Sequence, residues 1–90
     1  MELSLLDVRR YAIDERAEVR FGECVIDAKG HVRIPGAEKE LRAEDVFLAA
    51  ESFEVRGEGA PRRLARAALA RAIEESFARR GFAAAAHDDE

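Results

Sequence analysis

The sequence predicts a small α+β domain, and three observations support this. A helix-capping motif opens the chain, a stretch of period-two alternation follows, and a long amphipathic segment lies near the other end. We expect an N-terminal helix, a three-stranded antiparallel meander, a middle helix with a possible short extra strand, and a long C-terminal amphipathic helix. The 90 residues suit one domain, placed at residues 1–82, followed by a disordered tail at 83–90.

The first helix is expected over about residues 4–14. Ser4 and Asp7 have the S-x-x-D form of a capping box, in which the Ser4 hydroxyl accepts a hydrogen bond from a first-turn N–H. Arg9 falls inside the apolar face, so its side chain must extend to solvent or find a carboxylate. The apolar residues on that face are Leu5, Leu6, Val8, Ala12 and Ile13.

The alternation between residues 17 and 34 can be tested as a strand register, with a two-residue loop at 22–23 and a three-residue loop at 28–30. The inward pairs are then Val19 with Ile26, Phe21 with Cys24, Ile26 with Val32, and Cys24 with Ile34. The outward residues are Glu18, Arg20, Val25, Asp27, His31 and Arg33. Two independent loops give one consistent inside and outside, which predicts a three-stranded meander. Gly30 supplies the positive φ of the second turn.

The second half of the chain predicts two helices with an ambiguous segment between them. The first is best formed from about 43 to 51. Phe53 and Val55 then alternate with charged residues, which fits a short fourth strand or an extended linker. Pro61 is a favourable first residue for the long helix. Gly81 stands where a left-handed cap belongs, and Phe82 could contact Phe77. The apolar stripe of this helix is Leu64, Ala65, Ala68, Leu69, Ala72, Ile73 and Phe77.

Composition narrows the classes of function. The single cysteine excludes an intramolecular disulfide and a CxxC metal site. No apolar run approaches the roughly 18 residues that span a bilayer, so we expect a cytoplasmic protein with a reduced thiol and no membrane partner. The sequence shows no nucleophile elbow and no glycine-rich phosphate loop. We therefore expect no enzyme, no catalytic or metal-binding residues and no cofactor.

Two features of the predicted sheet have plain structural explanations. Glu18, Asp27 and His31 share one face, but exposed cross-strand charge pairing explains them better than an acid–base or metal site, because a flat face lacks enclosure. Cys24 stands between Phe21 and Ile34 in the predicted register, where a thiol acts as a small apolar side chain.

Arg62, Arg63 and Arg66 are the strongest candidate binding residues. Residues 61–80 hold six Arg and two Glu, which gives +4 within a chain of net charge −4. Cations in the first turn of a helix oppose its dipole, so the cluster could serve a phosphate or a carboxylate-rich partner. The alternative is pairing with nearby acids, namely Glu51, Glu54 and Glu58. The other candidate binding residues lie on the hairpin: Lys29, His31 and Arg33.

The stretch VIDAKGHVRIP, residues 25–35, resembles the D-x-K-G-R-[VI]-x-[IL]-P signature of the AbrB/MazE-type swapped-hairpin family of dimeric DNA-binding regulators and antitoxins. His31 stands at the usual arginine, and the family's G-D turn and last strand are absent. The resemblance implies DNA contacts from basic residues near the hairpin. The matching residues are Asp27, Lys29, Gly30, Val32, Ile34 and Pro35.

The stretch GEGAPRRLARAALARAI resembles the end of a double-stranded-RNA-binding domain, where G-x-G-x-S-K-K-x-A-K opens the last helix. The resemblance implies duplex-RNA contacts at that helix start, although the residues between Ile34 and Pro61 have no counterpart in that family. The matching residues are Gly57, Gly59, Arg62, Arg63, Ala65 and Arg66.

These observations favour a small non-enzymatic binding or adaptor module, homodimeric or an accessory subunit of a larger assembly. The partner is then a second copy or another protein. The alternative is a small nucleic-acid-binding regulator, either swapped-hairpin-like or duplex-RNA-binding-like.

Overall fold

The structure, a computed structural model, describes residues 2–35 and 42–81. The predicted α+β class is confirmed, whereas Phe82 and the expected tail at 83–90 lie outside the described residues. The elements are α1 (Leu5–Glu15), β1 (Glu18–Phe21), β2 (Cys24–Ile26), β3 (Val32–Arg33), α2 (Ala43–Ala49), β4 (Ser52–Arg56), β5 (Arg62–Ala65) and α3 (Arg66–Arg79). No helix in the described parts has the length and apolar character to cross a membrane.

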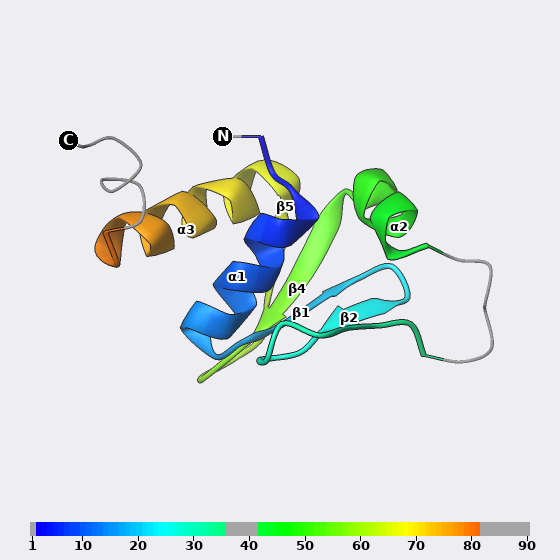
Figure 1. The fold of residues 1–90 in the computed structure, drawn as a ribbon, viewed down its shortest axis with the longest axis horizontal. Coiled ribbons are helices and arrows are strands. Elements are labelled where there is room, and N and C mark those ends of the chain that lie inside the picture. Colours follow the sequence, from blue (N-terminus) through cyan, green and yellow to red (C-terminus); the bar gives the residue numbers. More distant parts are fainter. Residues whose placement is uncertain (1, 36–41, 82–90) are drawn as a thin grey trace.

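The five strands form one antiparallel sheet in the order β3-β2-β1-β4-β5 (Figure 1). The predicted register is confirmed within the meander, because Phe21 pairs with Cys24, and Ile26 pairs with both Val19 and Val32. β3 ends at Arg33, so Ile34 makes no ladder pair with Cys24, although it packs against the core. The alternating segment around Phe53 is a strand, not a linker, and it pairs with the central strand β1.

The last helix begins later than predicted. Residues 62–65 form the strand β5, and α3 begins at Arg66, so the prediction that Pro61 opens the helix is wrong. The sheet explains the difference. Phe53 is fully buried on β4, and Leu64 lies directly opposite it as the cross-strand neighbour. Pairing with β4 thus outweighs the helix propensity of this segment.

Ser4 begins α1 as predicted, and its hydroxyl accepts a hydrogen bond from the Asp7 N–H at 3.1 Å. The buried face differs from the predicted one. Leu6 and Ile13 are 62% and 48% exposed, whereas Tyr11 is only 5% exposed. Ile13 contacts the glycine turn that follows β2, which draws it away from the centre of the core. The helix therefore packs through Val8, Tyr11 and Ala12.

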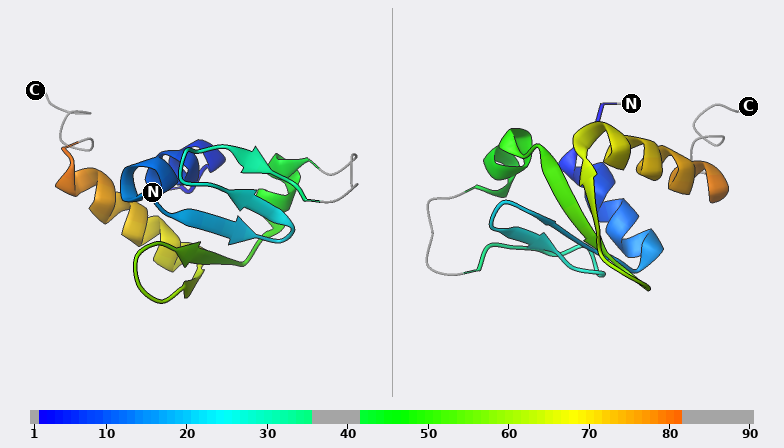
Figure 2. Two further views of the ribbon diagram at one scale, coloured as in Figure 1. Left: turned by 90° about the horizontal axis from the view of Figure 1, so that it is seen from below. Right: turned by 180° about the vertical axis from the view of Figure 1, so that it is seen from behind.

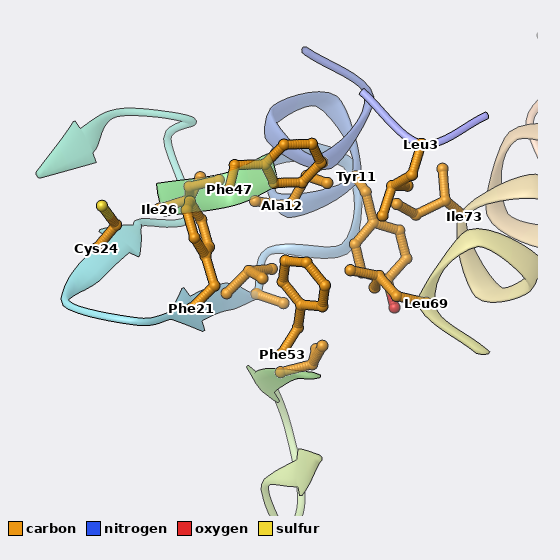
Figure 3. Close-up of a cluster of buried hydrophobic side chains, with 14 of the residues drawn as sticks. Leu3, Tyr11, Ala12, Phe21, Cys24, Ile26, Phe47, Phe53, Leu69 and Ile73 are labelled. Carbon is orange, nitrogen blue, oxygen red and sulfur yellow. The ribbon is translucent and has the colours of Figure 1, made fainter. Parts of the chain in front are cut away.

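The helices lie on one side of the sheet, and the core fills the space between them (Figure 2). Phe21, Phe47 and Phe53 meet there with ring centroids 5.7–5.8 Å apart (Figure 3). Such tilted and edge-on contacts add to the burial of the rings themselves. The fully buried residues that the sheet contributes are Val19, Cys24, Ile26 and Phe53. None of the helices in residues 2–35 and 42–81 lies over the other side of the sheet.

Candidate functional site

The Arg66 side chain binds the carbonyl end of α2 and does not line an open anion site. Its guanidinium donates hydrogen bonds to the carbonyls of Phe47 and, at 2.6 Å, of Ala50. It also lies 4.8 Å from the ring centroid of Phe47 and 5.2 Å from that of Phe53. α2 has no basic residue in its last turn, so Arg66 supplies the cation that the negative end of this helix favours.

Arg62 and Arg63 point to opposite faces of the sheet because they are consecutive residues of a strand. Arg62 lies on the covered side. Burial raises the pKa of the Tyr11 hydroxyl, and the neighbouring Arg62 guanidinium offsets part of that rise. Arg63 lies on the other side and donates to the Ser52 hydroxyl at 3.2 Å. The predicted cluster of three arginines at a helix start is therefore wrong, because the structure gives each a different environment.

The hairpin candidates surround one carboxylate. Asp27 Oδ1 accepts hydrogen bonds from the N–H groups of Lys29 and His31 at 2.9 and 3.0 Å. Its Oδ2 accepts from the Arg33 guanidinium at 2.9 Å. The His31 N–H is the main cause that lowers the pKa of Asp27 to about 2, with the Arg33 bond contributing. Asp27 thus stabilises the turn and orients Arg33.

Glu18, Asp27 and His31, the trio considered for acid–base chemistry, take part in separate ion pairs instead of forming one site. Glu18 pairs with Arg20 at 3.4 Å, and Asp27 pairs with Arg33 and more distantly with His31 Nδ1 at 3.8 Å. The His31 side chain is 69% exposed. Within residues 2–35 and 42–81, no group of three or more His, Cys, Asp or Glu side chains could hold a metal ion.

Cys24 is fully buried, and burial raises the pKa of its thiol. The expectation that it packs as a small apolar side chain agrees with this position. A thiol that is shielded from solvent and held in its protonated form by a raised pKa is a poor nucleophile.

The sheet face opposite the described helices carries several arginines in register with one another, and we call it the open face. It carries Glu18, Arg20, Val25, Asp27, Arg33, Glu54, Arg56 and Arg63. Four of these are arginines and three are acids, so this face has a net charge of +1 in a chain whose total is −4. The charge of the face is opposite in sign to that of the rest of the protein.

One cross-strand row of the open face runs through all five strands. Its members are Arg33 on β3, Val25 on β2, Arg20 on β1, Glu54 on β4 and Arg63 on β5, each opposite the next. We call these five residues the arginine row. Neighbouring strands lie about 4.8 Å apart, so the three arginines recur about every 10 Å across the sheet.

A shallow polar hollow of about 250 Å³ lies at the β5 end of this row. The side chains of Arg20, Ser52, Glu54 and Arg63 line it together with Phe21 and Gly22. Two guanidinium groups and a hydroxyl in one hollow can donate several hydrogen bonds to a carboxylate. Glu54 lowers the net charge, so the hollow suits a singly charged group better than a phosphate dianion.

The sequence predicted Arg33 and Arg63 as candidate binding residues and placed Arg20 on the outward face of the meander. It put Arg63 at a helix start, however, and did not place Glu54 and Arg63 in one row with Arg20. A signal was present, because two short runs, SFEVR and RRLA, flank a loop that contains Gly57 and Gly59. Strand-like runs separated by a glycine-containing loop are typical of a hairpin. The apolar stripe that begins at Leu64, together with Pro61, favoured a helix instead.

Comparisons with protein-family models, curated proteins and solved structures find no match for this chain.

Proposed function

We propose that this chain is a non-enzymatic protein-binding module, an adaptor or accessory subunit, that binds an acidic partner protein on its open face. The arginine row is the observation that carries this proposal. It places three arginines on alternate strands of one cross-strand row, on the face of the sheet opposite the described helices. Arginine is enriched in protein interfaces because its planar fork binds carboxylates in a bidentate manner.

The composition of the open face favours a protein partner over nucleic acid. Carboxylates of Glu18, Glu54 and Asp27 lie between the arginines and would repel a phosphate backbone. Every phenylalanine and tyrosine in the described ranges is buried on the covered side, so none can stack on an unpaired base. Val25 lies between Arg33 and Arg20 in the arginine row and supplies a small apolar contact, of the kind that protein interfaces contain beside their charged groups.

A second copy of this chain fits the open face poorly. In a symmetric face-to-face dimer with aligned rows, Arg20 faces Arg20 of the other copy, and Arg33 faces Arg33 or Arg63. Like charges that lie directly opposite one another disfavour such a dimer. We therefore favour a different chain as the partner on this face.

Nucleic acid is the second candidate, and the hairpin favours it. Lys29 and His31 stand beside Arg33 at the end of the sheet, and the His31 and Arg33 side chains are both 69% exposed. A duplex could contact this tip through its phosphates without lying across Glu18 and Glu54, although it would still meet Asp27, which pairs with Arg33.

The test is a titration of the ¹⁵N-labelled full chain with a ten-residue glutamate peptide and, separately, with duplex DNA and duplex RNA at one salt concentration. We expect the peptide to shift the amides of Arg20, Val25 and Glu54. The double variant Arg20→Glu/Arg33→Glu should weaken peptide binding roughly tenfold or more. Arg71→Glu on α3 is the control for charge reversal away from the sheet, because Arg71 is exposed. It changes the net charge by −2, half the change that the double variant makes.

Three results would count against the proposal. The peptide could shift no amide of the open face, or the double variant and the Arg71→Glu control could bind it equally. Alternatively, either duplex could bind more tightly than the peptide with shifts at Lys29 and His31, and nucleic-acid binding would then replace the proposed function.

A further inference from the structure

We infer that the free edge of β5 receives an extended segment of the acidic partner as a sixth strand of the sheet. This inference rests on the proposed function, because it specifies how that partner is held. We expect the segment to carry acidic and apolar residues in alternation.

β5 is available for such pairing. It is the last strand of the sheet, its four residues are largely exposed, and only Leu64 is half-buried. The β4–β5 hairpin forms one rim of the molecule (Figure 2, left). An edge strand presents main-chain N–H and C=O groups that no neighbouring strand binds, and an extended peptide can pair with them.

The opposite edge is a poorer template. β3 has only two residues, Val32 and Arg33. Pro35 follows shortly after and has no N–H to donate. Asp27 already uses its side chain to hold the turn that precedes this strand. A strand added here would gain few main-chain hydrogen bonds, so of the two edges β5 is the one that can bind an extended segment.

The residues of β5 determine what the added strand should carry. Side chains directly opposite one another in neighbouring strands share a face. The partner residue opposite Arg63 would therefore extend the arginine row on the open face, beside the hollow that Arg63 and Arg20 line. An acidic side chain there can pair with Arg63 and reach this hollow.

The partner residue opposite Leu64, the next position of β5, should be apolar. Leu64 lies on the covered face, opposite the fully buried Phe53. A partner residue opposite Leu64 would continue this apolar pair at the margin of the core. An apolar side chain fits there, whereas a charged one would lose solvent without gaining a counterion. Acid opposite Arg63 and apolar residue opposite Leu64 together give the alternating pattern.

A second copy of the chain lacks this pattern. An antiparallel β5–β5 pair that keeps both faces aligned can place Arg63 opposite Arg63. The other central register places Leu64 opposite Leu64 and Arg63 opposite Ala65. Neither register gives Arg63 a carboxylate, so β5 discriminates against its own copy while it admits an acidic strand.

The experiment uses three capped ten-residue peptides and the full-length chain. The first alternates glutamate and valine. The second replaces each glutamate with lysine. The third has the side chains of the first but carries N-methyl groups on alternate backbone nitrogens, which removes its strand-pairing donors. Binding is measured by fluorescence anisotropy, and amide hydrogen exchange of residues 62–65 is followed with and without peptide.

We expect the glutamate–valine peptide to bind and to slow exchange of the β5 amides. The lysine and N-methylated peptides should bind at least about tenfold more weakly. The Arg63→Glu variant should bind the glutamate–valine peptide more weakly than the parent chain, by a similar factor. The Arg71→Glu variant should bind it with an affinity within about twofold of the parent chain.

Some outcomes separate this inference from the proposed function. If the N-methylated peptide binds as tightly as its parent and only Arg20 and Arg33 respond, the open face binds the partner but the edge does not, and the inference fails alone. If no acidic peptide binds, both proposals fail. If sedimentation shows a dimer whose β5 amides are protected without peptide, the edge belongs to a second copy and the inference is overturned.

Discussion

Replacement of Arg66 by alanine tests whether this residue stabilises the fold or serves a binding site. The side chain joins the end of α2 to the start of α3 through the carbonyls of Phe47 and Ala50. It also covers the rings of Phe47 and Phe53. Loss of these contacts leaves the last carbonyls of a short helix without their cationic donor.

The expected cost is about 3 kcal/mol of unfolding free energy. A hydrogen bond from a charged group contributes about 1.5–3 kcal/mol net, and each cation–π contact contributes about 0.5–1 kcal/mol. These terms overlap because one guanidinium makes them all, so we take less than their sum. In a domain of this size such a loss lowers the melting temperature by roughly 12–24 °C.

The assay is urea denaturation of Arg66→Ala beside Arg71→Ala. Both variants exchange arginine for alanine on α3, and Arg71→Ala should stay within about 0.5 kcal/mol of the parent. Removal of Arg66 also relieves its opposition to the dipole of α3, which makes the measured loss a lower limit for its contacts with α2. Arg66→Lys keeps the charge without the planar fork and should fall between the two. A difference below about 0.5 kcal/mol between the two alanine variants would refute the structural role of Arg66.

Three further predictions concern other parts of the fold. The Ser76 hydroxyl, aided by Arg80, lowers the pKa of Glu15 below 4.5. Its stabilising contribution is therefore present above that pH and is lost in acid, and Glu15→Gln should reduce the fall in the urea midpoint between pH 7 and pH 3. Gly30 has φ +83° and a Cβ there would lie 2.7 Å from Ile13 Cδ1, so Gly30→Ala should cost about 1–2 kcal/mol in urea denaturation. The buried Cys24 thiol should react with a disulfide reagent only at the rate of unfolding, followed by absorbance.

Each of these has a control. Glu15→Gln would contradict the first prediction if its loss of stability in acid equalled that of the parent. Gly59 has φ +92° and open space around it, so Gly59→Ala measures the backbone strain alone. Equal losses at Gly30 and Gly59 would show that the contact with Ile13 costs nothing. Rapid modification of Cys24 in native buffer would contradict its burial.

The meander could be predicted because its information is local. Asp27 and Gly30 fix one turn within four residues of chain, and that turn sets the register of Ile26 against Val32. The other half of the sheet could not be predicted in this way. The pairing of β5 depends on the burial of Phe53 against α2 and the meander. The local hairpin signal, two short runs around a glycine-containing loop, competes with the helical apolar stripe that begins at Leu64 and does not decide between them.

The candidate site was predicted in part for the same reason. The outward positions of Arg20 and Arg33 follow from the meander register, and the structure confirms them. Arg66 looked like a binding residue because its position opposes the dipole of its own helix. Its actual partner is the carbonyl end of another helix, nineteen positions earlier in the chain for Phe47. Proximity of this kind arises only once the chain has folded.

The pairing between β1 and β4, which we call the seam, determines when in folding the arginine row becomes complete. The strands β1 to β3 pair with their chain neighbours, and so do β4 and β5, whereas β1 and β4 join segments that are distant in sequence. Such nonlocal pairing is the slow part of folding for a small sheet. Arg33 and Arg20 lie on one side of this seam, and Glu54 and Arg63 lie on the other. A chain that has folded only one half therefore displays only part of the arginine row, which makes a complete recognition surface a property of the finished fold alone.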